Sequence, residues 1–143
     1  MIEQDYILRL MREFFEALEL LLRSKKSVEI KIEKLQQLYE QYVGPADFYH
    51  AAPMEEVMAS FERFKPEERL YKMEMLAELY FVDADWHTGP ARDELMQRAL
   101  TMFRFVDRHG KTYSMDRLQK ISQLEKQLAN GKPYKPESAR SVC

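Results

Sequence analysis

The sequence predicts an all-α fold, and three observations lead to this prediction. Apolar residues recur every three or four positions through six successive segments, which is the period of a helix. No segment alternates apolar and polar residues in the manner of a half-buried strand. Glycine and proline together make up only ten of the 143 residues, too few for the many turns of a β-sandwich or barrel. We therefore expect about six helices, joined into antiparallel hairpins wherever the connections are short.

The first two helices are predicted over residues 3–23 and from Ser27 to Gly44. Apolar side chains cover so much of the first segment that we expect it to be buried on two sides. The Ser27 hydroxyl can cap the second helix, with Glu29 in its first turn. Glycine and proline at its far end stop it, and residues 46–52 are predicted to form a loop or a short turn.

The third and fourth helices are each predicted to begin at a proline. A short helix starts at Pro53, and a longer one runs from Lys65-Pro66 to about Trp86. Proline suits the first helical position because its φ is already helical and its missing N–H has no partner to lose there. Glutamates follow both prolines, where negative charge favours a helix start.

The last two helices are bounded by glycines. The fifth lies between Gly89-Pro90 and Gly110, and the sixth begins at the capping residue Ser114 and stops at Asn130-Gly131. We expect residues 1–130 to form a single helical domain. Residues 131–143 have little apolar content and are predicted to be a flexible basic tail.

Two motifs in the fourth and fifth helices resemble the tetratricopeptide (TPR) hairpin. Leu76-Ala77-x-x-Tyr80 matches the pattern of the first TPR helix, and Ala99-x-x-x-Phe103 matches that of the second. The chain departs from the family at Met73, where the motif has tryptophan, in a wider spacing between the two motifs, and in lacking the closing proline. The resemblance covers about residues 68–109 and implies a right-handed, α-solenoid-type array of hairpins. An unrelated antiparallel helical bundle is the alternative.

The opening residues, from Met1 to Glu13, also resemble the start of a family of short uncharacterised bacterial helical proteins. This likeness implies a bacterial origin and no particular chemistry. No positively charged, cleavable signal precedes the first helix, and the apolar runs are far shorter than the roughly 18 residues of a membrane span. We therefore expect a cytoplasmic protein that does not enter a membrane.

The TPR resemblance also implies a partner-binding face, lined by the first helix of the hairpin. Carried over to this sequence, that face consists of Tyr71, Glu74, Glu78 and Phe81. An acidic and aromatic strip of this kind suits a basic or amphipathic peptide or helix. The basic segment Lys132–Arg140 is one candidate ligand, from the same chain or from a second copy.

The sequence predicts no catalytic residue, metal site or cofactor. Its one cysteine is Cys143, which has no histidine nearby, and neither a Gly-x-Ser-x-Gly motif nor a phosphate-binding glycine loop occurs. Asp47 and His50 lie in the predicted loop and are interpreted as loop polarity. The Asp83-x-Asp85-Trp86-His87 cluster contains metal-binding residue types, but the solvated end of a helix explains it more simply. We therefore expect a protein that is not an enzyme.

Charge is distributed unevenly along the chain. Residues 1–107 carry a net charge of −7 and residues 108–143 carry +5, which leaves −2 for the whole chain. This asymmetry favours an electrostatic contact of the basic part with an anionic partner, or with the acidic middle of a neighbouring copy.

These features favour a TPR-like protein–protein interaction module whose partner is a protein, peptide or helix of unknown identity. The alternative is a homo-oligomeric structural protein, in which the apolar first helix, including Phe14 and Phe15, packs against a symmetry mate. A nucleic-acid binder that uses Arg117, Lys120 and the tail is a third hypothesis. The sequence favours it least, because no basic strip interleaved with aromatic residues is present.

Overall fold

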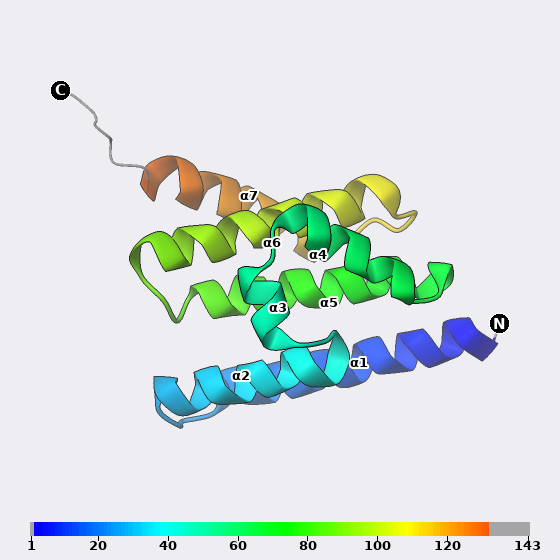
Figure 1. Cartoon of the computed structure of the whole chain (residues 1–143), viewed down its shortest axis with the longest axis horizontal. Coiled ribbons are helices and arrows are strands. Elements are labelled where there is room, and N and C mark those ends of the chain that lie inside the picture. Colours follow the sequence, from blue (N-terminus) through cyan, green and yellow to red (C-terminus); the bar gives the residue numbers. More distant parts are fainter. Residues whose placement is uncertain (1, 132–143) are drawn as a thin grey trace.

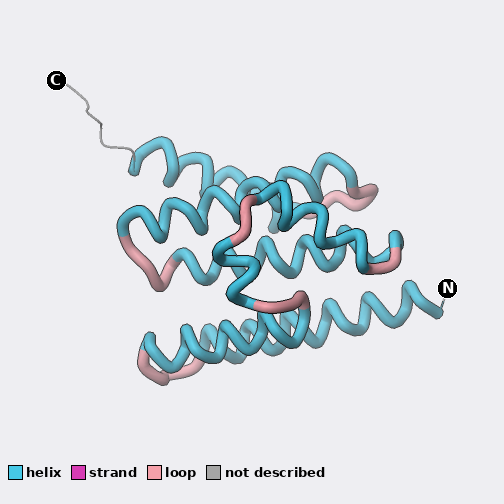
Figure 2. The backbone as a smooth tube through the Cα atoms, viewed as in Figure 1, coloured by secondary structure: helices cyan, strands magenta, loops and turns pink. Residues whose placement is uncertain are grey.

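The computed structural model describes residues 2–131, which form an all-α fold without any strand in this range (Figure 1). The predicted fold class is therefore confirmed. Figure 2 shows that short loops connect the helices of the described part. The elements are α1 (Ile2–Arg23), α2 (Val28–Tyr42), α3 (Ala46–Ala51), α4 (Met54–Ser60), the 3₁₀ turn η1 (Phe61–Arg63), α5 (Pro66–Ala84), α6 (Gly89–His109) and α7 (Met115–Gly131).

Helix α5 is the central helix of the fold. It forms a hairpin with α6 and also packs against α1 and α2, while α7 packs against α6. In Figure 1, α1 and α2 lie below α5, and α6 and α7 lie above it. Because neighbours cover α5 on several sides, almost every residue from Lys72 to Ala84 is buried, and only Glu74 and Phe81 in this stretch are partly exposed.

One prediction is wrong: residues 46–51 form a helix, α3, rather than a loop. Pro45 stands at its N-cap position, and the carboxylate of Glu40 accepts a hydrogen bond of 2.9 Å from the backbone N–H of Ala46. A carboxylate from the preceding helix thus satisfies one of the free N–H groups that a helix start always leaves. The ring of Tyr49 is fully buried, which holds the short helix against the core.

A continuous hydrophobic core runs through the described residues from α1 to α7. Phe14 of α1 meets Tyr42 of α2 edge to face, with 5.3 Å between ring centroids. Tyr39 of α2 meets Tyr80 of α5 in the same way at 6.2 Å. The predicted basic tail, residues 131–143, lies outside the described residues except for Gly131, where α7 ends.

Helix α1 is less covered than its composition suggested. It contacts α2 and α5, but five of its large hydrophobic side chains stay exposed to solvent. These are Tyr6, Leu8, Phe15, Leu20 and Leu22. The expectation that α1 is buried on two sides therefore holds for only part of its circumference.

The side chain of Arg98 ties the α3 region to α6. Its guanidinium group is buried and donates to the carbonyl oxygens of Tyr49 at 3.0 Å and Ala52 at 2.7 Å. Glu94, one turn earlier on α6, accepts a third hydrogen bond at 2.8 Å. Tyr49 lies in the last turn of α3 and Ala52 follows it, where a helix leaves its C=O groups without internal partners.

Replacing Arg98 with alanine is expected to destabilise the fold by about 2–4 kcal/mol, because it removes the donor to the buried Ala52 carbonyl and leaves a cavity. Chemical denaturation measures this loss. The matched control is Arg104→Ala, whose 2.6 Å pair with Glu125 is half exposed on both sides and should change stability by less than about 1 kcal/mol. Equal losses in the two variants would contradict this assignment.

Candidate functional site

The four residues of the predicted binding strip lie along one face of α5. Tyr71 and Glu74 border a cavity of about 600 Å³ that also touches Arg117 of α7. Glu78 and Phe81 border a second cavity of about 260 Å³, together with residues of α1 and α7. The structure therefore divides the strip between two cavities and places α7 and α1 beside it.

Cations of α7 already neutralise the two glutamates of the strip. Lys120 donates to Glu78 at 2.7 Å, and its ammonium group lies 5.5 Å from the centre of the Phe81 ring. Arg117 donates to Glu74 at 3.3 Å and to Asp107 at 3.1 Å. The acidic middle of the chain thus meets the basic part of the same chain, whereas the sequence suggested an anionic partner or the acidic middle of a neighbouring copy.

These contacts change what the strip and its cations can offer to a partner. Glu78 is only 2% exposed and Arg117 equally so, which leaves neither charge available at the surface. A basic peptide would find the carboxylate of Glu78 already paired. Arg117 and Lys120, which the nucleic-acid hypothesis required, are likewise engaged within the fold.

Burial makes Glu78 an unusual carboxyl group. Removal from water raises its pKa from 4.5 to about 7, although the charge of Lys120 and its hydrogen bond act in the opposite direction. Conversely, Glu78 raises the pKa of Lys120, against the effect of burial. The ammonium group therefore stays charged at neutral pH, while Glu78 gains or loses its proton near pH 7.

We expect the free energy of unfolding of Glu78→Gln to increase relative to that of the wild type as the pH rises from about 5 to about 8. The folded-state pKa lies above that of the unfolded chain, so folding binds a proton in this range and the wild type loses stability as the pH rises. Urea unfolding at several pH values measures the difference. In Lys120→Met, the pKa of Glu78 should rise further, because the charge that lowers it is removed. A difference in unfolding free energy between Glu78→Gln and wild type that does not change with pH would contradict the expectation.

The buried carboxylate of Asp83 gathers a second set of polar side chains. It lies near the end of α5 and accepts hydrogen bonds from Tyr39 of α2 at 2.8 Å and from His50 of α3 at 2.7 Å. His87, one turn further along the chain, contacts its other oxygen at 3.0 Å. The sequence grouped Asp83 with His87, whereas His50 was interpreted as loop polarity beside Asp47, so its contact with Asp83 was not predicted.

Both ring nitrogens of His50 face hydrogen-bond acceptors. Nδ1 lies 2.8 Å from the carbonyl oxygen of Ala46, and Nε2 lies 2.7 Å from Asp83. A carbonyl oxygen can only accept, so this arrangement is satisfied best by a doubly protonated imidazolium. Burial lowers the pKa of His50, but the hydrogen bonds to Asp83 and Ala46 and the charge of Asp83 outweigh it and raise the pKa above 6.5.

The Asp83 cluster joins α2, α3 and the end of α5. His50 and His87 border a cavity of about 530 Å³, which the carboxylates of Asp47 and Glu94 also line. Among the described residues, no group of three or more histidine, cysteine, aspartate or glutamate side chains is placed to hold a metal ion. Three donors on one carboxylate instead connect α2, α3 and the end of α5.

Replacing His50 with glutamine should cost more stability at about pH 6 than at about pH 9. The folded-state pKa of His50 is raised, so its stabilising contribution is complete below about 6.5 and is lost as the pH rises through the folded value. Urea unfolding measures the difference between variant and wild type, and an NMR titration of the ring follows the proton directly. Asp83→Asn should lower the pKa of His50. An equal cost at both pH values would contradict the ion pair.

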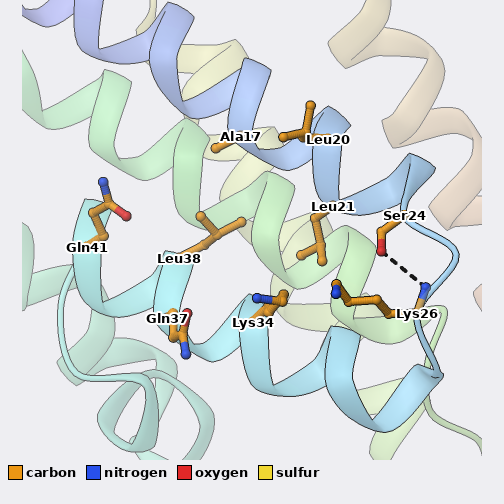
Figure 3. A pocket seen from close by; sticks show the side chains of 9 residues that line it. All are labelled: Ala17, Leu20, Leu21, Ser24, Lys26, Lys34, Gln37, Leu38 and Gln41. Carbon is orange, nitrogen blue, oxygen red and sulfur yellow. Dashed lines mark hydrogen bonds between the residues drawn. The ribbon is translucent and has the colours of Figure 1, made fainter.

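An open groove lies between α1 and α2, close to the turn that joins them (Figure 3). Its volume is about 440 Å³, and Leu21 and Leu38 contribute apolar surface to it. Leu20 borders the groove and is 68% exposed, the largest value for any apolar side chain of α1 in the described range. Lys26 and Lys34 also line it, and neither forms an ion pair with a described residue. The apolar spacing of the sequence did not predict this groove.

Comparisons with known proteins do not assign the chain to a family. No protein-family model, curated protein or solved structure matches it. The resemblance to TPR hairpins therefore stays a prediction. Among the described residues, no helix is both long and apolar enough to span a membrane.

Proposed function

We propose that this protein is a helical protein–protein interaction module that binds an acidic amphipathic helix in the α1–α2 groove. The observation that carries the proposal is the exposed side chain of Leu20 beside two lysines that have no ion-pair partner in the described chain. Leu20, Leu21 and Leu38 together give the groove a contiguous apolar lining beside this positive charge, which favours a binding surface over a solvated one.

The shape of the groove supports a helix as its occupant. Two packed helices present a furrow along their length, and the ridge of a third helix fits into such a furrow. A partner helix would place apolar residues at positions i, i+3 or i+4, and i+7 over Leu20, Leu21 and Leu38. Acidic residues at its flanks would then meet Lys26 and Lys34, which sets the orientation of the bound helix.

The other surfaces support an interaction site less well. The strip on α5 has its glutamates paired with Arg117 and Lys120, and the Asp83 cluster is directed at joining helices. The resemblance to TPR hairpins supports an interaction role as well, because such hairpins present helical surfaces to peptides. In this proposal, however, the partner is acidic and binds α1 and α2, in place of the basic partner on α5 that the sequence suggested.

A displayed library of helical peptides, selected on the purified protein, tests this proposal. We expect selected peptides to carry a Leu, Ile, Met or Phe stripe with flanking Asp or Glu, and to bind with micromolar affinity by fluorescence anisotropy. Leu20→Glu and Lys34→Glu should each weaken the binding of such peptides at least about tenfold.

Two exposed positions on α7 provide matched controls for the groove variants. Met115→Glu introduces the same acid at another exposed apolar residue, and Lys126→Glu reverses an exposed lysine; neither should alter peptide binding. Selected peptides that are basic, or that bind Leu20→Glu as tightly as the wild type, would contradict the proposal. The absence of any selected peptide would contradict it equally.

A further inference from the structure

A second apolar surface of α1 is only partly covered by the described chain. Leu8, Phe15 and Leu22 follow one another at intervals of seven residues, and their side chains are 37–47% exposed. Residues seven apart lie almost directly above one another on a helix, so these three form one stripe. We refer to them as the α1 stripe.

The α1 stripe is one half of a heptad pattern. Met11 and Leu18 fall between its members at the spacing of the alternate core position in a coiled coil. Leu18 is buried and Met11 packs against the core, so the fold of this chain covers those two positions. The α1 stripe itself stays exposed. Helix α1 is therefore packed against its own fold at one set of heptad positions, and among the described residues no helix fully covers the other set.

Charges beside the α1 stripe make it complementary to itself. Arg12 and Glu19 are exposed, lie on the same flank of the stripe, and form no ion pair with a described residue. In an antiparallel pair of α1 helices centred on Phe15, Leu8 of one copy meets Leu22 of the other, and the two Phe15 rings meet each other. In the same register, Arg12 of each copy lies about one residue from the position directly opposite Glu19 of the other copy, so the pair of charges occurs twice in the dimer.

We infer that the α1 stripe docks a second copy of this chain, as an antiparallel two-fold dimer. A two-fold interface must be self-complementary in both shape and charge, and the order apolar, positive, apolar, negative, apolar along α1 meets this requirement. The cavity bordered by Phe15, Leu22 and Phe81 lies beside the stripe, and it offers room for a side chain of the second copy.

The dimer is independent of the proposed partner groove. Leu20 lies five residues after Phe15 and so points about 140° away around the helix. Each copy in the dimer would therefore keep its α1–α2 groove open, and the assembly would present two grooves to its partners. Loss of dimerisation and loss of peptide binding are separate measurements, so either proposal can fail without the other.

Sedimentation equilibrium of the purified full-length protein over a range of micromolar concentrations tests the dimer. We expect a reversible dimer whose dissociation constant rises about a hundredfold or more in Phe15→Glu and in Leu22→Glu, since each change places two acids at the interface. Leu20→Glu, which adds the same acid to the same helix on the other face, should leave the dimer unchanged. Circular dichroism of each variant checks that the fold is kept.

Charge reversal and cross-linking test the register. Arg12→Glu and Glu19→Arg should each weaken the dimer, and the double variant should restore it. With Cys143→Ser present, Leu8→Cys and Leu22→Cys should cross-link to each other when mixed and not to themselves. A monomeric wild type, a dimer insensitive to both stripe variants, or self-cross-linking of Leu8→Cys would overturn the inference.

Discussion

The hydrogen bonds to the buried carboxylate of Asp83 are the interaction on which the rest of the fold depends. A carboxylate in a core without donors would cost several kcal/mol, so its presence requires that α2, α3 and the turn after α5 converge on it. His50 donates its second N–H within α3, to Ala46, and thereby links the same carboxylate to the start of that helix. Arg98 binds the carbonyls at the other end of α3. A helix of six residues, too short to be stable alone, is thus held at both ends by buried charge.

Long-range ion pairs also decide which surfaces of the molecule remain open. The cations of α7 occupy the acidic face of α5, so the most charged strip in the middle of the chain is closed from within. Helix α1, in contrast, exposes apolar side chains to solvent beside charges that have no ion-pair partner among the described residues. The asymmetry between the acidic and basic parts of the sequence is explained in part by this internal contact. It gives no separate argument for an anionic partner at Arg117 or Lys120.

Local patterns predicted the helices, and contacts across the sequence determined the rest. Six helices follow from apolar spacing, with prolines and glycines near their ends, because those signals act over a few residues. Helix α3 was not predicted because the groups that stabilise it come from outside its own residues. Glu40 of the preceding helix accepts from the N–H of Ala46, and Asp83, 33 residues beyond His50, accepts from the ring of His50. The strip from Tyr71 to Phe81 was placed on one face correctly, because helical spacing determines it. Its neutralisation was not predictable, because Lys120 reaches Glu78 across 42 residues of sequence.

The apolar character of α1 illustrates why composition alone could not separate a core helix from a binding helix. Ile7, Phe14 and Leu18 face the core, while Leu20 and the α1 stripe face solvent in two other directions. The charge next to each open face distinguishes the two: lysines without an ion-pair partner among residues 2–131 lie beside Leu20, whereas one cation and one anion lie beside the α1 stripe. A face flanked by a single sign of charge selects a partner of the opposite sign, whereas a face flanked by both signs at symmetric positions selects its own copy. The two proposals therefore assign different partners to one helix, because its exposed apolar faces are similar and the charges beside them differ.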